Sequence, residues 1–133
     1  MRQHNKIVSI VLALLVFVIS AAPICSATEV KGKCGPDCTY TLSDDGVLCI
    51  SGTGTITKKF SEDEQINKIV IEDGIETIGK ESFAHLKHQK LEIVLPDSLI
   101  EIGEQAFDYS LTSNIQFPEN LKKIGDDAFG DNY

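Results

Sequence analysis

Three stretches of this chain, residues 69–83, 93–107 and 115–129, align with one another without a gap. The aligned positions are aliphatic or aromatic, apart from one glycine: Ile69/Ile93/Ile115, Ile71/Leu95/Phe117, Ile75/Leu99/Leu121, Ile78/Ile102/Ile124, Gly79/Gly103/Gly125 and Phe83/Phe107/Phe129. The glycines are 24 and then 22 residues apart, whereas repeats built from helix pairs need roughly 33 residues or more. The chain is therefore predicted to fold as a solenoid of short repeats.

Each repeat opens with a short extended run, at 69–71, 93–95 and 115–117, whose first and third residues share one face. This alternation predicts a β-strand. Pro96 and Pro118 close the strand in the second and third repeats, because proline cannot donate a ladder hydrogen bond. The next two apolar positions stand three residues apart, which fits a tight extended turn or a second short strand.

After its glycine, each repeat has a segment that ends in phenylalanine, at 80–83, 104–107 and 126–129. An acidic residue stands near the start of each segment, where a helix terminus favours negative charge, so we expect a single helical turn. The expected fold class is α/β: a short solenoid of parallel strands and single helical turns, preceded by a small β-hairpin module.

The repeats are expected to stack on one another. One repeat has too few apolar side chains to offset the conformational entropy lost when its backbone is ordered. Neighbouring repeats must therefore supply the difference by pairing strands and by stacking Phe83, Phe107 and Phe129 into one spine.

The N-terminus has the pattern of an export signal. Two basic residues precede a charge-free, mostly apolar run at 7–22, and small residues follow at 25–27, so we predict a signal peptide at residues 1–27. An uncleaved anchor is the alternative, but the run is shorter than the roughly 20 residues that cross a bilayer as a helix. A lipid anchor on Cys25 is a further alternative, for which the preceding Pro-Ile is a poor lead-in.

The chain is acidic, with 12 basic and 20 acidic side chains and a formal net charge of -8. Loss of the predicted signal peptide removes Arg2 and Lys6, and the remainder is long enough for one compact unit. Phosphate backbones and anionic membranes would be repelled, so we expect no nucleic acid partner and no stable membrane insertion after cleavage. A solvated surface that keeps a secreted protein soluble explains the charge.

The remainder of the chain is divided into an N-terminal β-hairpin module at 28–60 and a repeat solenoid at 61–133. The solenoid is expected to hold three repeats, of which the last is incomplete.

Within the hairpin module, residues 28–33 are polar and are expected to form a loose leader. Two β-prone runs near 38–43 and 47–51 flank Asp45-Gly46, a pair typical of a tight hairpin turn because glycine adopts positive φ at no steric cost. Two further glycines, in Ser51–Thr55, suggest a bend or bulge after the second strand.

Three cysteines, Cys34, Cys38 and Cys49, follow the predicted signal peptide. In an oxidising compartment one disulfide is expected, with Cys34–Cys38 as the first pairing and Cys38–Cys49 as the second. A zinc or redox site is not favoured, because no second pair of cysteines or histidines stands nearby to complete it.

One repeat also carries a family resemblance. Residues 93–107 read Ile-x-Leu-Pro-Asp-Ser-Leu-x-x-Ile-Gly-x-x-Ala-Phe, which resembles the BspA-type leucine-rich repeat of surface proteins from host-associated bacteria and from parasitic or commensal protists. Residues 47–54 are similar to the short β module that often precedes such arrays. The resemblance covers about 34–133. It implies a curved leucine-rich repeat solenoid, secreted or displayed on a cell surface for adhesion or recognition, with fibronectin, host surfaces and other microbes as family-level partners.

A catalytic function and a cofactor are not expected, because the sequence has neither a nucleophile motif nor a phosphate loop. His85 and His88 could share a metal with Glu81 or Asp108, but solvated loop histidines are the simpler interpretation. The aspartates in 126–131 lack the alternating ligand spacing of a dedicated calcium loop.

Two hypotheses about function remain. The first is a non-catalytic recognition module that binds a protein, host-surface or extracellular-matrix ligand through outward-facing strand residues: Lys68, Val70, Glu92, Val94, Asn114 and Gln116. Exposed valines on such a face suggest contact with a partner. The second hypothesis is a structural cap, or a truncated fragment of a longer array, that assembles with other chains through its open C-terminal edge, since solenoid ends normally need capping.

Overall fold

The computed structural model describes residues 30–61, 63, 65–86, 90–110, 112 and 114–132. In these ranges the chain forms β1 Val30–Lys33, β2 Cys38–Leu42, β3 Val47–Gly52, β4 Gly54–Ile56, β5 Lys68–Ile71, β6 Ile75–Ile78, β7 Glu92–Val94, β8 Glu101–Ile102 and β9 Lys123–Ile124. The predicted signal peptide at 1–27 lies outside the described residues.

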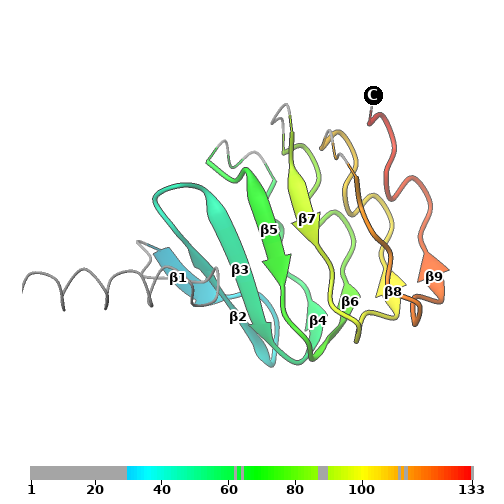
Figure 1. The fold of residues 1–133 in the computed structure, drawn as a ribbon, viewed down its shortest axis with the longest axis horizontal. Helices are drawn as coiled ribbons and strands as arrows, with labels where there is room; N and C mark the ends of the chain where they lie inside the picture. The colour runs from blue at the N-terminus through cyan, green and yellow to red at the C-terminus, as the bar shows by residue number, and fades with distance from the viewer. Residues whose placement is uncertain are drawn as a thin grey trace, which may run out of the picture.

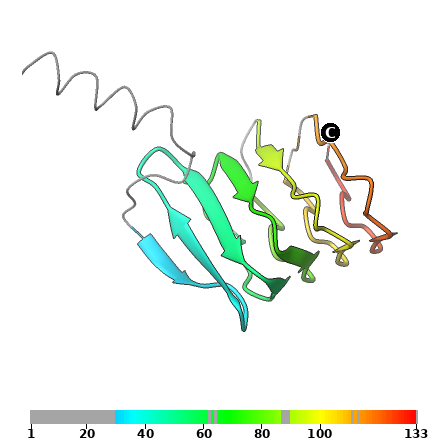
Figure 2. The ribbon, with the colours of Figure 1, turned by 60° about the horizontal axis from the view of Figure 1, so that its bottom comes forward.

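The strands form two sheets that run along one stack (Figures 1 and 2). Sheet A has the order β1-β2-β3-β5-β7, and sheet B has the order β4-β6-β8-β9. Neighbours among β3, β5 and β7 pair in parallel, and so do all neighbours in sheet B. The first two repeats each contribute one strand to each sheet, so the prediction of a parallel-strand solenoid is confirmed.

The predicted hairpin is formed by β2 and β3, and its turn is made by Gly46 with a φ of 86°. The Gly46 N–H donates to the Ser43 carbonyl at 3.0 Å. The leader, however, is not loose throughout. Val30–Lys33 forms β1, an edge strand that pairs antiparallel with β2. This pairing gives hydrogen-bond partners to backbone N–H and C=O groups of β1.

The hairpin module is continuous with the repeats. Its strand β3 pairs in parallel with β5, and β4 pairs in parallel with β6. Between β3 and β4 the chain bends at Gly52 and Gly54, whose φ angles are 113° and 81°, as the two glycines predict. Residues 47–56 thus form a first turn on which the repeats are stacked.

The single helical turns predicted after each repeated glycine are not found, and no residue in the described ranges is helical. Residues 80–85, 104–109 and 126–131 form turns instead. Two non-glycine residues in each of them adopt positive φ: Glu81 and His85, Gln105 and Tyr109, Asp127 and Asp131. A left-handed residue interrupts a right-handed helix, so the described part of the chain is all-β rather than α/β.

Hydrogen bonds between these turns replace the bonds that a helix would make within itself. The Phe83 N–H donates to the Ala106 carbonyl at 2.8 Å, and the Phe107 N–H donates to the Ala128 carbonyl at 2.7 Å. The ladder satisfies backbone groups that would otherwise be buried without partners. It therefore serves the same purpose as strand pairing on the other two sides of the stack.

The repeated glycines allow the turns to approach closely. A Cβ on Gly79 would lie 2.3 Å from the Ile56 carbonyl oxygen, and a Cβ on Gly125 would lie 2.5 Å from the Glu104 nitrogen. Any side chain at these corners would push successive turns apart.

The third repeat departs from its expected pattern. No strand is assigned to its first run at 115–117, although β9 forms as its second strand. Phe117 is 48% exposed, whereas Ile71 at the equivalent place is 2% exposed. Within the described residues no further turn lies over this run, whereas β5 pairs with β3 on one side and with β7 on the other.

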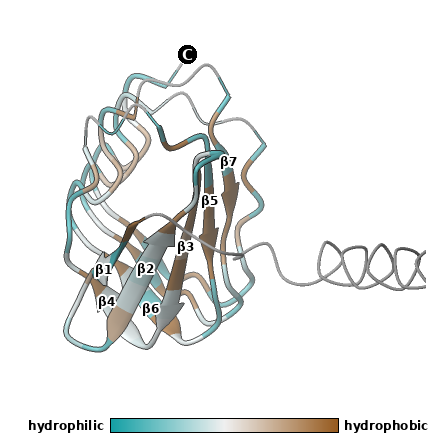
Figure 3. Cartoon of the chain, turned by 90° about the vertical axis from the view of Figure 1, so that its left-hand side faces the viewer, coloured by the Kyte–Doolittle hydropathy of each residue, from teal (hydrophilic) through white to brown (hydrophobic). Residues whose placement is uncertain are grey.

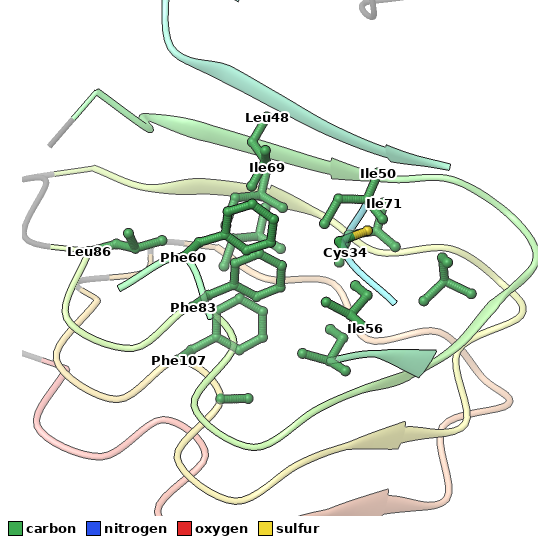
Figure 4. Close-up of a cluster of buried hydrophobic side chains, with 14 of the residues drawn as sticks. Cys34, Leu48, Ile50, Ile56, Phe60, Ile69, Ile71, Phe83, Leu86 and Phe107 are labelled. Atoms are coloured by element: carbon green, nitrogen blue, oxygen red, sulfur yellow. The ribbon is translucent and has the colours of Figure 1, made fainter. Parts of the chain in front are cut away.

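The core is a column of aromatic rings between the two sheets. Phe83 and Phe107 stack at 5.3 Å between centroids, and Phe107 and Phe129 stack at the same separation, as predicted for the spine. Phe60 extends the column at 5.5 Å from Phe83, and Tyr40 closes it edge-to-face at 5.0 Å. Figure 4 shows three of these rings layered beside aliphatic side chains of the strands. Seen along the stack, apolar residues follow the strands (Figure 3).

Polar side chains also tie the turns together. The buried Ser110 hydroxyl accepts from the Leu86 N–H at 3.3 Å and donates to the Phe83 carbonyl. One turn later, the Asn132 side chain accepts from the Ser110 N–H at 3.0 Å and donates to the Phe107 carbonyl at 2.7 Å. The sequence alignment did not single these residues out, because they lie beyond the shared apolar pattern.

Candidate functional site

The predicted ligand-binding residues fall on the solvent side of sheet A, which we call the outer face. In β5 and β7 the core residues alternate with Lys68, Val70, Glu92 and Val94. Lys68 pairs with Glu92 and Val70 pairs with Val94 in the parallel register. The structure thus brings these four residues together as two adjacent rows.

The two rows differ in chemistry. The Lys68 ammonium lies 2.7 Å from the Glu92 carboxylate, so this row is an ion pair across the strands. Val70 is half-buried, and Val94 is 40% exposed. The valine pair is apolar, and the charges of Lys68 and Glu92 neutralise each other. The free-energy cost of removing water from this surface is therefore low.

Asn114 and Gln116 are exposed next to this face but lie outside any assigned strand. Asn114 has a φ of 55°, so the chain is not extended there. The structure therefore places four of the six predicted residues on one sheet and leaves these two on the irregular first run of the third repeat.

Ion pairs also link successive turns elsewhere on the surface. The Lys80 ammonium donates to Glu104 at 3.0 Å, and that carboxylate holds the Lys80 pKa above its usual value. A hydrogen bond from Lys59 holds the pKa of Glu81 below its usual value. Exposed pairs of this kind contribute little stability. They do, however, favour the register in which each turn lies directly over the previous one.

The two cysteines of the first predicted disulfide are free thiols in the structure, with their Sγ atoms 3.2 Å apart. Both are buried, and burial raises the pKa of Cys34 to about 12. The alternative pairing of Cys38 with Cys49 does not fit. Cys38 lies opposite Gly52, on the core side of the sheet with Leu48, while Cys49 lies opposite Thr41 on the other side. Cys49 is not a free thiol.

The metal sites considered from the sequence are not assembled in the described part of the chain, where no three metal-ligating side chains come together. His85 stacks on Tyr109 at 5.3 Å, and Glu81 pairs with Lys59. His88 lies outside the described residues. In the same ranges no helix is long and apolar enough to cross a membrane.

Two adjoining clefts open at the N-terminal end of the stack, which the sequence analysis did not anticipate. The first has a volume of about 320 Å³ and includes Tyr40 and Phe60 in its lining. The Lys58 ammonium lies 5.5 Å from the centre of the Phe60 ring at this place. The second, of about 610 Å³, is lined largely by polar residues of the hairpin turn. Both are open to solvent.

The repeats of 22 to 24 residues pair their strands in parallel, turn at a glycine after each of their strands in sheet B, and stack on an aromatic column, which together define a repeat solenoid. Residues 55–133 match the family described as BspA type Leucine rich repeat region (6 copies), and the chain belongs to this family. The resemblance seen at 93–107 is confirmed.

A solved structure gives the same assignment. The chain is similar to a leucine-rich repeat protein from Eubacterium ventriosum, with a TM-score of 0.67 and 26% sequence identity. The match covers 76% of this chain and 29% of that one. A search of curated protein sequences found no match. Leucine-rich repeats of this kind are protein-interaction modules and are typically non-catalytic, and proteins of the BspA type are often secreted or found on cell surfaces.

Proposed function

We propose that this protein is a secreted or surface-displayed recognition module that binds a protein ligand through the outer face of sheet A. The observation that carries this proposal is the pairing of Val70 with Val94 beside the Lys68–Glu92 ion pair. A solvent-facing valine that is 40% exposed on a regular strand favours contact with a partner.

The shape of the face supports a protein ligand over a small molecule. Five strands lie side by side without interruption from β1 to β7, so the face is an extended surface rather than a hollow. Small ligands need concave sites that bury most of their surface. Proteins and matrix polymers, in contrast, bind extended faces through a few apolar anchors with a polar rim.

The polar residues around the valines would supply that rim. Asn114 and Gln116 are exposed on the side of the third repeat, and the Lys68–Glu92 pair borders the valines within the sheet. Extracellular-matrix or host-surface proteins, fibronectin among them, are the ligands we propose. The signal peptide predicted at 1–27 supports exposure of the protein to such ligands.

Binding to immobilised matrix proteins and to host cells, measured with the unmodified protein and with the double variant Val70→Asp, Val94→Asp, tests the proposal. We expect the variant to lose at least about tenfold in affinity, since two charges would have to be desolvated in the interface. Ile100→Asp is the matched control, because Ile100 is 37% exposed but does not belong to sheet A. Undiminished binding by the double variant, or an equal loss in the control, would show that the outer face is not the site.

A further inference from the structure

The charged residues of sheet A differ in sign from those of the chain as a whole. The five strands of this sheet contain one acidic residue, Glu92, and three lysines, Lys31, Lys33 and Lys68. The whole chain, in contrast, has 12 basic and 20 acidic side chains and a formal net charge of -8. The strands of sheet A are therefore a locally basic part of an acidic protein.

Two of these lysines lie on the outer face, on the same side of the sheet as the valine pair. The strand register can be followed across the sheet from Lys31, which lies opposite Thr41. Thr41 lies opposite Cys49, and Cys49 lies beside Val70 in the parallel register of β3 and β5. Lys33 is two residues further along β1 than Lys31, so its side chain is on the same face.

The charges of Lys31 and Lys33 are not neutralised by the described part of the chain. Both residues are exposed, and neither forms an ion pair with a described residue. Lys68, in contrast, lies 2.7 Å from the Glu92 carboxylate. The outer face thus presents two positive charges on β1 and an apolar pair on β5 and β7.

The basic and apolar parts of the outer face are separate. Cys49, which lies between them, is 4% exposed, so a partner contacts the lysines and the valines at two places. The strands β1, β2, β3, β5 and β7 lie side by side (Figure 1). At a spacing of about 4.8 Å between strands, β1 is about 14 Å from β5 and about 19 Å from β7. An extended chain rises about 3.3 Å per residue, so about four to six residues of a partner span this distance.

We propose that the partner of the outer face is an acidic protein segment, with carboxylates that contact Lys31 and Lys33 and apolar side chains that contact Val70 and Val94. This inference rests on the proposed function and names the chemistry of the ligand for the same face. Complementary charge steers association and disfavours basic partners. A polyanionic polymer fits less well, because its charge would extend beyond two lysines to the acidic remainder of the chain.

Selection from a display library of random peptides of about 12 residues, which exceeds the required span, tests the proposal. We expect the purified protein to enrich peptides in which Asp or Glu stands about four to six residues from an apolar pair. A synthetic peptide of the enriched sequence should bind the double variant Lys31→Glu, Lys33→Glu at least about fivefold more weakly, and added salt should weaken its binding to the unmodified protein. Lys122→Glu is the matched control, because Lys122 is exposed but does not belong to sheet A.

Selection on the lysine variant itself gives a second result, since its peptides should carry Lys or Arg where the first set carries acids. A library that yields no binder, enriched peptides without acidic residues, or an equal loss in Lys122→Glu would overturn the proposal. Heparin that binds the unmodified protein but not the lysine variant would assign the lysines to a polyanion and overturn it equally.

The valine variant separates this inference from the proposed function. If the selected peptide binds the lysine variant undiminished but is lost from Val70→Asp, Val94→Asp, the outer face remains the binding site and the acidic partner is wrong. If neither variant weakens binding, both the site and its partner chemistry are wrong.

Discussion

Phe83 and Phe107 occupy the same position in successive repeats, and their rings stack with centroids 5.3 Å apart and an interplanar angle of 20°. Both side chains are fully buried. The two residues are 24 positions apart in the chain, so each such contact joins one turn of the solenoid to the next. The column that they begin makes the short repeats interdependent.

Phe107→Ala removes the middle ring of this column. We expect it to lower the free energy of unfolding by about 3 to 5 kcal/mol, because a large buried cavity is left between Phe83 and Phe129. Phe117→Ala is the matched control and should cost about 1 kcal/mol, since this ring is half-exposed and has one edge contact, with Phe129. Urea unfolding followed by circular dichroism measures both. Equal losses for the two variants would contradict the column.

Gly103→Ala should disrupt the corner of the second repeat. A Cβ there would lie 2.8 Å from the Gly79 carbonyl carbon and 2.8 Å from the Ile78 oxygen, which are backbone atoms that cannot yield without separating the turns. We expect a loss of about 3 kcal/mol or more in the free energy of unfolding. Gly54→Ala is the control, because it meets no atom within 4 Å and adds only the strain of its positive φ, about 1 to 2 kcal/mol. The reverse order of the two losses would contradict this account of the corners.

The stability of the reduced protein should fall at alkaline pH because of Cys34. Burial raises the pKa of this thiol from 9.0 to about 12, so between these values the unfolded chain has lost the proton that the folded chain keeps. Each pH unit in this window then costs about 1.4 kcal/mol of stability, which is fully present below pH 9. Cys34→Ala should lack this component of the slope in the same reducing buffer. A common slope for both proteins would show that another group is responsible.

The disulfide between Cys34 and Cys38 remains a prediction for protein that folds in an oxidising compartment. Their Sγ atoms lie 3.2 Å apart, so a small movement would allow the bond. The raised pKa of Cys34 makes the folded thiol a poor nucleophile, so we expect the bond to form during folding rather than afterwards. Mass spectrometry of the peptide containing residues 34–38 should show the loss of two hydrogens. Full alkylation of both thiols after denaturation without reductant would contradict it.

Periodicity alone was sufficient to predict the parallel stack, because positions such as Ile78 and Ile102 can repeat at this interval only if successive turns superimpose. The turn segments could not be predicted in the same way. Glu81 and Gln105 adopt positive φ although they are not glycines, and an acid-rich segment that ends in phenylalanine suits a helical turn equally well. The turn with positive φ is stabilised instead of a helical turn by hydrogen bonds between successive turns. These bonds join residues far apart in the sequence, so no local sequence pattern predicts them.

The sequence predicted the positions of the candidate site residues that lie on regular strands, but not of those that lie outside them. Alternation in β5 and β7 correctly placed Val70 and Val94 on the outer face, because strand residues alternate between faces wherever one face is buried. The same rule did not place Asn114 and Gln116 correctly, because alternation between faces requires a regular strand and residues 114–117 do not form one. The side-chain role of Asn132 was missed because a single polar residue near the end of a repeat gives no periodic signal.

The most direct test of the central claim, that the repeats wind around one continuous aromatic column, is a nuclear Overhauser spectrum of protein labelled selectively at phenylalanine. The account predicts cross-peaks between the rings of Phe83 and Phe107 and between those of Phe107 and Phe129, which stack at 5.3 Å in both cases. Absence of both cross-peaks from a folded sample, with the rings accessible to a solvent probe, would contradict it.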